Sequence, residues 1–404
     1  MASDELIQAR VELAGEKTMA GTKSSMVDLI SEKIFLSGES YFDALIKDID
    51  RAKTSIDLET YIFQNGVLGG WIAEALIRAA HRGVIVRILV DGAGSSDWGH
   101  SLARQLRDTA NIESRVFHPL PWRVWQWHHG LLNRAWVYNI FYLLARINKR
   151  NHRKVCVIDE SIVYIGSANI DDCHLTLNSG GKNWRDTGVC LEGVDTIDLR
   201  EAFEVAWNHL PLQERIQTLF ERVQINSPIR LNYTRHRRRV FYKSLLRRIS
   251  RCQHRVWITN AYFVPDNFLL VKLTDLAQKG VDVRILLPQK SDVVIMTWAS
   301  AAFYDKLLKS GVRIFEYTPS MLHAKSLILD DWFIIGSSNL NHRSLLHDFE
   351  VDVTIRSTEA KTILEQQFLM DLSQATEIQW LNWQKSSWIK KMIGRLLLYV
   401  KYWI

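Results

Sequence analysis

The sequence predicts an α/β protein made of two similar lobes, because one pattern of residues occurs in it twice. The pattern is a histidine and a lysine with one residue between them, an aspartate five positions after the lysine, and then Gly-Ser-any residue-Asn. It spans residues 152–169 in the first copy and 323–339 in the second. A strand–helix–strand pattern precedes each copy, and 404 residues are enough for two cores. We therefore expect a duplicated α/β unit.

The elements of the first lobe follow from the positions of its apolar residues. We expect a helix over residues 41–52, a strand over 55–63, a helix over 69–82 and a buried strand over 84–90. Gly83 ends the second helix, since glycine readily takes the backbone conformation found at helix ends. A strand, a helix and a strand in this order predict two parallel strands joined by a crossover.

The second lobe repeats this order. We expect a strand over residues 255–263, a helix over 267–279 and a strand over 281–287. The clearest match aligns Arg-Gly-Val-Ile-Val-Arg-Ile-Leu-Val at 82–90 with Lys-Gly-Val-Asp-Val-Arg-Ile-Leu-Leu at 279–287. Each lobe then reaches its motif, whose apolar residues predict a buried strand.

Composition and charge limit the partners and the compartment. The formal net charge is +7 and the pI is near 9.1, which favours anionic partners, either nucleic acid or anionic lipid. The four cysteines include no Cys-x-x-Cys pair, so we interpret them as core residues in a reducing compartment. We see no signal peptide and no apolar run of about eighteen residues, and expect no transmembrane helix.

Changes in composition divide the chain into five parts. We expect a polar N-terminal segment (1–28), a first lobe (29–224), a basic connector (225–250), a second lobe (251–380) and an amphipathic C-terminal helix (381–404). The connector is rich in arginine and lysine. It is either a solvated link or a patch that contacts phosphate groups.

Each motif copy places an imidazole and an ammonium side by side at a strand start, because alternate strand residues share a face. This pairing suits a phosphate-like substrate. Cleaving a phosphodiester requires a nucleophile, a proton donor for the leaving oxygen and fixed positive charge. The candidate catalytic residues are His152, Lys154, Asp159, His323, Lys325 and Asp330. The candidate phosphate-binding residues are Ser167, Asn169, Ser337 and Asn339.

Two further acids are candidates for orienting the histidines, since a nucleophilic histidine needs a carboxylate on its second ring nitrogen. Asp186 follows the first motif histidine by 34 residues, and Glu350 follows the second by 27. A metal site is disfavoured because the lysine of each motif would repel a cation. We expect no cofactor.

The two motif copies resemble those of the phospholipase D superfamily, and their surroundings resemble its bacterial cardiolipin synthase branch. The second resemblance rests on Glu-Thr-Tyr-Ile-Phe (59–63), Tyr-Phe-Val-Pro-Asp (262–266), Ile-Leu-Leu-Pro-Gln-Lys-Ser-Asp (285–292), Met-Leu-His-Ala-Lys (321–325) and His-Asp-Phe-Glu-Val (347–351). It covers about residues 30–380 and is closest to the shorter type without N-terminal transmembrane helices. It implies two pseudo-symmetric α-β-α lobes whose motifs meet in one shared active site.

The resemblance also implies a phosphatidyltransferase that makes cardiolipin from phosphatidylglycerol through a phosphohistidine. His152 would attack the phosphorus of the lipid donor. His323 would protonate the departing glycerol and then deprotonate the acceptor hydroxyl. The sequence does not distinguish this assignment from its mirror image. In the family, acids like Asp186 and Glu350 bond the histidines, so we interpret the two motif aspartates as scaffold residues first.

Two apolar segments predict contact with a membrane surface. An insertion over residues 120–150 makes the first lobe about 29 residues longer before its motif than the second, and alternates aromatic with basic residues. We interpret it as a flap that enters the bilayer, with a lid packed on the body as the alternative. Residues 381–404 predict an in-plane amphipathic helix or a helix docked on protein. With phosphatidylglycerol as substrate, we expect a peripheral protein on the cytoplasmic face of the bacterial inner membrane.

Three other functions remain open at this point. A nuclease of the same superfamily would bind nucleic acid through the basic connector, but it predicts a polar insertion and tail, so we expect no nucleic-acid partner. Lipid hydrolysis requires only that water replaces the acceptor alcohol. A non-catalytic membrane adaptor would need none of the motif histidines and lysines. The sequence does not indicate the oligomeric state.

Overall fold

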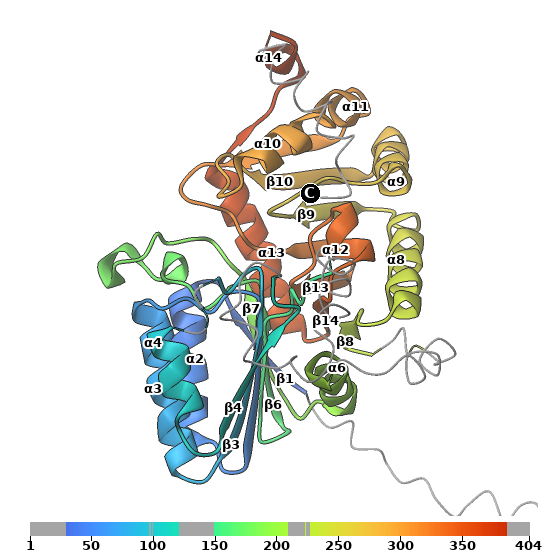
Figure 1. Cartoon of the computed structure of the whole chain (residues 1–404). Helices are drawn as coiled ribbons and strands as arrows, with labels where there is room; N and C mark the ends of the chain where they lie inside the picture. Colours follow the sequence, from blue (N-terminus) through green and yellow to red (C-terminus); the bar gives the residue numbers. More distant parts are fainter. Residues whose placement is uncertain are drawn as a thin grey trace, which may run out of the picture.

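The computed structural model describes residues 30–96, 98, 100–120, 149–208, 223 and 227–385. They form two β-sheets with flanking helices. Figure 1 shows the first lobe below, in blue to green, and the second above, in yellow to red. The predicted pair of α/β lobes is confirmed.

The first sheet has seven strands in the order β1-β7-β6-β5-β2-β3-β4. They are β1 (Ser31–Phe35), β2 (Ser55–Thr60), β3 (Ile85–Asp91), β4 (Ile112–Phe117), β5 (Val155–Ile158), β6 (Ile162–Gly166) and β7 (Gly188–Glu192). Strands β2, β3 and β4 are parallel, as the crossover predicts. Strand β5, which continues from the first His-x-Lys, is antiparallel to β2.

Helices cover both faces of this sheet. Helices α2 (Gly38–Arg51), α3 (Val67–His81) and α4 (Ser101–Arg107) pack on the outer face. Helix α6 (Ile197–Asn208) packs on the inner face. Two 3-10 helices, η2 (Asp172–His174) and η3 (Leu177–Ser179), lie in the loop after β6. Helices α2 and α3 begin two to three residues before the predicted starts.

The second sheet has eight strands in the order β15-β11-β10-β9-β12-β13-β14-β8. They are β8 (Ile229–Leu231), β9 (Arg255–Thr259), β10 (Asp282–Pro288), β11 (Arg313–Tyr317), β12 (Ser326–Leu329), β13 (Trp332–Gly336), β14 (Val351–Ile355) and β15 (Ala375–Glu377). Strands β9, β10 and β11 are parallel, and β12 is antiparallel to β9. The order β12-β9-β10-β11 therefore repeats β5-β2-β3-β4.

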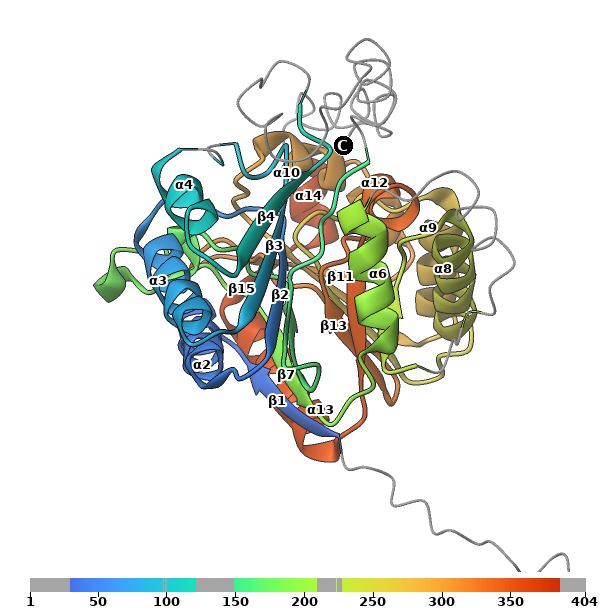
Figure 2. The same ribbon diagram turned by 60° about the horizontal axis from the view of Figure 1, so that its bottom comes forward.

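The two sheets face each other across a shared apolar core. The helices of the second lobe are α8 (Arg235–Ile249), α9 (Asn267–Gln278), α10 (Val294–Ala301), α11 (Tyr304–Lys309), α12 (His342–Leu346), α13 (Thr358–Ser373) and α14 (Trp380–Lys385). Residues of α6, α13 and the inner faces of both sheets form the central core. Figure 2 shows the resulting layers, from α2 and α3 on one side to α8 and α9 on the other. This packing fixes one lobe against the other.

Residues 227–250, the described part of the segment predicted as a basic connector (225–250), instead belong to the second lobe. Strand β8 pairs with β14, and α8 contributes Leu245 and Ile249 to the second lobe's outer core. Arg230 and Arg238 are only 5% and 8% exposed. The Arg230 guanidinium lies 4.6 Å from the centre of the Phe241 ring. The number of basic residues did not indicate this burial, because arginine can bury its aliphatic stem and stack its planar guanidinium on an aromatic ring.

Several predicted segments lie outside the described residues. These are the polar N-terminal segment, most of the aromatic insertion (121–148) and the chain beyond Lys385, which holds most of the predicted amphipathic helix. Its described beginning, α14, packs on the second lobe through Trp383, whose ring lies 5.0 Å from that of Tyr304. Among the helices that the structure describes, none has the length and apolar character needed to cross a bilayer.

Candidate active site

Backbone contacts between the lobes bring the two motifs together. The backbone N–H of His152 donates to the carbonyl of Phe349 at 2.9 Å, and that of His323 donates to the carbonyl of Arg185 at 2.8 Å. Each acceptor belongs to the other lobe and directly precedes one of the two candidate orienting acids. The same segments form isolated parallel bridges. Each motif histidine thus lies beside the orienting acid of the opposite lobe.

The side chains show the same pairing across the two lobes. Nδ1 of His152 lies 3.0 Å from both carboxylate oxygens of Glu350, and Nδ1 of His323 lies 2.8 Å from Oδ1 of Asp186. Both candidate orienting acids are therefore at the site. Sequence separations of 34 and 27 residues, counted within each motif copy, did not indicate this pairing across the lobes.

Both histidines line one cleft of about 390 Å³ between the lobes. Asn169 and Asn339 also line it, as expected of phosphate-binding residues, and so does Arg343. Because Nδ1 of each histidine is bound to a carboxylate, Nε2 is the nitrogen left for chemistry. The cleft therefore offers two imidazoles and polar side chains to a single phosphate group.

The motif lysines lie beside the histidines. Nζ of Lys154 donates to the carbonyl of His152 at 2.7 Å, and Nζ of Lys325 donates to that of His323 at 2.6 Å. Nζ of Lys325 also lies 3.1 Å from Nε2 of His323. Burial lowers the pKa of Lys154 to about 7 and that of Lys325 to about 8. Lys154 is therefore only partly charged at neutral pH, whereas Lys325 keeps most of its charge there and loses it in a mildly alkaline range.

We expect the transfer rate to fall as pH rises through about 7 to 8, because Lys154 and then Lys325 lose the charge that would hold the phosphoryl oxygens. In a Lys154→Arg variant the guanidinium stays charged. Its alkaline limb should move up by about one pH unit, to the point where Lys325 titrates. A profile of kcat/KM against pH in mixed micelles checks this. An unmoved alkaline limb in Lys154→Arg would contradict the assignment.

The buried site shifts the pKa values of both histidines and both acids. Burial lowers the pKa of His152 well below its usual value, and burial with Lys325 lowers that of His323 to about 4. Burial raises the pKa of Glu350 to about 7, although Lys154 opposes this. Burial also acts to raise the pKa of Asp186, but His174 and His323 outweigh it and hold that pKa well below its usual value. The two acids, equivalent in the fold, thus differ electrostatically.

Two predicted phosphate-binding residues have another role. The Ser167 hydroxyl donates to Asp186 at 2.8 Å, and the Ser337 hydroxyl donates to Glu350. Both serines are fully buried. The prediction was wrong for Ser167 and Ser337 because a hydroxyl beside a buried carboxylate donates to that carboxylate before it can reach a ligand.

The motif aspartates do not reach the cleft, so listing them with the catalytic residues was wrong, while interpreting them as scaffold residues first agrees with the structure. The Asp159 carboxylate accepts from the backbone N–H groups of residues 53–55 at 2.7–3.1 Å. The Asp330 carboxylate accepts from those of residues 253–255 at 2.9–3.0 Å. Both have positive φ, +50° and +53°. Each ties the hairpin after its motif to the start of the neighbouring strand.

We expect Asp159→Ala and Asp330→Ala each to lower the free energy of unfolding by about 2 kcal/mol, because backbone donors lose a charged acceptor at a partly exposed site. The kcat of each variant should stay within about threefold of wild type at 20 °C. Urea unfolding and steady-state kinetics check the two halves of this prediction. A loss of kcat as large as that of a histidine variant, without loss of stability, would show that Asp159 and Asp330 act in catalysis.

Sequence reasoning missed two residues that touch the orienting acids. Nδ1 of His174 lies 2.5 Å from Oδ2 of Asp186, and the Ser344 hydroxyl donates to Glu350. His174 follows Asn169 by five residues, and Ser344 follows Asn339 by the same number. This equal spacing was the signal available in the sequence.

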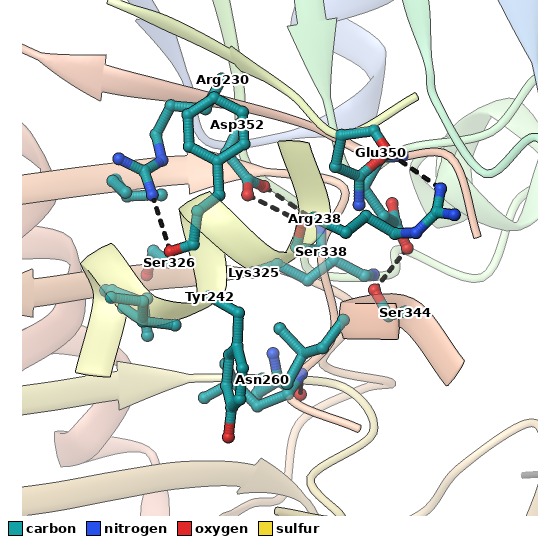
Figure 3. A pocket seen from close by; sticks show the side chains of 17 residues that line it. Arg230, Arg238, Tyr242, Asn260, Lys325, Ser326, Ser338, Ser344, Glu350 and Asp352 are labelled. Carbon is teal, nitrogen blue, oxygen red and sulfur yellow. Dashed lines mark hydrogen bonds between the residues drawn. The ribbon is translucent and has the colours of Figure 1, made fainter. Parts of the chain in front are cut away.

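A second, smaller cavity of about 60 Å³ lies behind Lys325 and Glu350 in the second lobe. Figure 3 shows Arg230, Arg238 and Ser344 among its lining residues. At the equivalent place in the first lobe Tyr41 packs against Gly188, where any added Cβ would clash with the ring. The two halves of the site therefore differ in the space behind their acids.

His174, Asp186 and His323 place potential metal-binding atoms within 4.8 Å of one another. Asp186 accepts from both rings at Nδ1, so a cation bound among these atoms would have to displace both protons. It would also lie beside the ammonium of Lys325. The donor set thus suits hydrogen bonding better than metal binding.

Comparison with known proteins agrees with this geometry. The family model described as "Cardiolipin synthase, PLD-like domain" matches residues 45–180 and 245–372, one segment in each lobe. Cardiolipin synthase 1 of Bacillus anthracis is 30% identical over 384 residues, which cover 91% of this chain and 71% of that protein. A cardiolipin synthase of Staphylococcus aureus is 32% identical over 369 residues, covering 89% and 70%.

Solved structures of more distant proteins share the fold. Phosphatidylserine synthase of Haemophilus influenzae has a TM-score of 0.64 at 14% identity and covers 92% of this chain and 93% of that one. Polyphosphate kinase of Porphyromonas gingivalis has a TM-score of 0.55 at 12% identity, and the match spans 92% of this chain but 56% of that one. At such identities these likenesses concern the fold alone. The family match over both lobes and the identity to the two synthases show more: the chain belongs to the cardiolipin synthase family of phospholipase D-like proteins.

Proposed function

We propose that this protein is a phosphatidyltransferase that makes cardiolipin from phosphatidylglycerol, or from a related phospholipid donor and an alcohol acceptor. The observation that carries the proposal is the convergence of His152 and His323 on one cleft, each with Nδ1 on a buried carboxylate. A cleft of about 390 Å³ suits a glycerophosphate headgroup rather than a whole lipid, so the acyl chains stay outside.

The reaction proceeds in two displacements. Nε2 of His152 attacks phosphorus, the bond from phosphorus to the glycerol oxygen breaks, and Nε2 of His323 gives that oxygen a proton. Burial and Lys325 lower the pKa of His323 to about 4, but the anionic phosphate of a bound substrate offsets the charge of Lys325 and favours a protonated His323. His323, now neutral, takes the proton of the acceptor hydroxyl, whose oxygen displaces His152 from phosphorus. Asn169 and Asn339, which line the cleft, hold the phosphoryl oxygens in both steps, and Lys154 and Lys325 stabilise the negative charge from beside the histidines. Glu350 and Asp186 stabilise the charge that appears on their histidines.

Mass spectrometry of lipids after incubation with phosphatidylglycerol vesicles tests this function. We expect cardiolipin and free glycerol in equal amounts. Phosphatidate in place of cardiolipin would identify a hydrolase, since water would then have replaced the lipid acceptor. Unchanged phosphatidylglycerol would contradict the proposal for this donor.

The cleft rim supports the further proposal that the protein acts as a peripheral protein on a membrane surface, at the cytoplasmic face of the bacterial inner membrane. Val293, Val294 and Ile295, at the start of α10, are 42%, 58% and 38% exposed. Val293 and Ile295 also line the cleft. Three adjacent exposed β-branched residues beside a headgroup cleft suit contact with the acyl boundary of a bilayer.

We expect Val294→Asp to weaken binding to phosphatidylglycerol vesicles about tenfold, because a charge replaces an apolar group that would enter the interface. Val294 does not line the cleft, so turnover of a micellar short-chain donor should stay unchanged. Sedimentation with vesicles measures the binding. The matched control is Val271→Asp on α9, since Val271 is 41% exposed and also does not line the cleft. Equal binding by both variants would remove α10 from the membrane-contact surface.

A further inference from the structure

The two orienting acids sit in matching hydrogen-bond relays that differ in one member. In the first lobe, the backbone N–H of Asn169 donates to Nε2 of His174 at 3.1 Å, and His174 contacts Asp186. In the second lobe, the backbone N–H of Asn339 donates to the Ser344 hydroxyl at 2.9 Å, and Ser344 contacts Glu350. The first lobe thus pairs aspartate, the shorter acid, with histidine, the longer partner. The second lobe pairs glutamate, the longer acid, with serine, the shorter partner.

The first relay admits a single arrangement of protons. A backbone N–H can only donate, so Nε2 of His174 must accept and its proton must be on Nδ1. Nδ1 therefore donates to Oδ2 of Asp186. Oδ1 of Asp186 accepts from the Ser167 hydroxyl and from Nδ1 of His323. A proton on Oδ2 would face the N–H of His174 and have no acceptor, so the bond from His174 favours the ionised carboxylate.

The second relay is not restricted in this way. The Ser344 hydroxyl can accept from the backbone of Asn339 and still either donate to Glu350 or accept from it, because a hydroxyl has two lone pairs and a rotatable proton. Ser344 and Glu350 also line the cavity in Figure 3, which gives the hydroxyl space to turn. The Ser344 hydroxyl therefore tolerates either protonation state of Glu350, whereas the Nδ1–H of His174 favours the ionised form of Asp186.

We infer that His174 is a positioning residue that holds Asp186 in its ionised form and so assigns the proton-transfer role to His323. A proton-transfer histidine must gain and lose a proton at Nε2 in every cycle, and a carboxylate that is kept ionised at Nδ1 stabilises its protonated form each time. His174 is 2% exposed, and Trp184 packs against both His174 and His323, with ring centres 5.5 and 5.6 Å away. The inference rests on the proposed function, since it refines the role of one of its two histidines.

The leaving group of the donor provides the test. Phosphatidyl-p-nitrophenol releases a stable anion and needs no proton, whereas phosphatidylglycerol releases an alkoxide that does. We expect His174→Ala to lower turnover of phosphatidylglycerol by ~10–100-fold but release of p-nitrophenol in the first turnover by less than about threefold. Ser344→Ala, the matched change beside the nucleophile, should slow release of p-nitrophenol as well.

The pH dependence of turnover gives a second test, because it would not change on substitution if His174 were purely structural. The titratable groups around Asp186 are His174, His323, Lys154, Lys325, Cys173 and Tyr262. Without His174, Asp186 becomes easier to protonate. The acid limb of phosphatidylglycerol turnover should therefore move to higher pH by at least about one unit.

Rescue variants keep the inference testable if His174→Ala folds poorly. His174→Asn can still donate to Asp186 and should restore part of the phosphatidylglycerol turnover. The double variant His174→Ser/Asp186→Glu transplants the second-lobe pair into the first lobe and should exceed His174→Ser alone. A folded His174→Ala enzyme with wild-type rate and acid limb, equal losses with both donors, or a His174→Ser/Asp186→Glu enzyme no faster than His174→Ser would overturn the inference. If His323→Ala itself turned over phosphatidylglycerol, the proposed function would fail instead.

Discussion

We expect His152→Ala to reduce transfer by at least about 10³-fold, because the variant has lost the nucleophile while the rest of the cleft is intact. His323→Ala should be equally inactive on phosphatidylglycerol, whose leaving glycerol needs a proton. It should nevertheless react once with phosphatidyl-p-nitrophenol, since that leaving group departs as an anion. The two histidines therefore differ in outcome although both variants are inactive on the natural donor.

The covalent intermediate makes this difference measurable. His323→Ala should release p-nitrophenol in a burst of one equivalent and then stall, because no base remains to activate the acceptor. Peptide mass spectrometry of the stalled enzyme should find the phosphatidyl group on His152. His81→Ala, at an exposed position at the end of α3, is the control and should behave as wild type. A modified His323 in a stalled His152→Ala enzyme would establish the mirror-image assignment.

Much of the fold was predictable because the duplication appears in local patterns. Both crossover units and the two motif strands lie where apolar periodicity places them, and the duplication indicated two equivalent lobes. Even a difference in turn length is visible: Ile158 pairs with Ile162, whereas Leu329 pairs with Trp332, one residue closer. Such features depend on neighbours in the chain, which a sequence displays directly.

The errors share a physical cause, because each concerns a contact between separate elements that only folding brings together. Ser167 and Ser337 donate to Asp186 and Glu350, which lie just before the next strand, rather than to a substrate. Arg230 is buried against aromatic rings of other elements, so its charge suggested a solvated connector. The spacing of Asp186 from its own motif histidine said nothing about the backbone bridges that send it to the other lobe. Because the two lobes are similar, the sequence fits an acid paired with the histidine of its own lobe as well as one paired with the histidine of the other lobe. Only the packing of the lobes decides between these two pairings.

That selection has a kinetic consequence for Glu350, which comes from the second lobe but contacts the histidine of the first. We expect Glu350→Gln to lower kcat by ~10²–10⁴-fold, because the amide keeps the shape but loses the charge that stabilises His152 as it attacks phosphorus. The effect should appear in the first displacement. The burst of p-nitrophenol should therefore slow by the same factor.

Asp186→Asn is the matched variant in the other lobe, and it distinguishes pairing across the lobes from pairing within them. Since Asp186 contacts His323, its loss should leave the burst nearly intact and slow the later turnovers, in which His323 activates the acceptor. Rapid-mixing kinetics with phosphatidyl-p-nitrophenol separate the two phases. Had each acid served the histidine of its own motif copy, Asp186→Asn would slow the burst and Glu350→Gln would spare it. Mass spectrometry first identifies which histidine carries the phosphatidyl group. If that histidine is His152, a burst slowed by Asp186→Asn and spared by Glu350→Gln would contradict the pairing of each acid with the histidine of the other lobe.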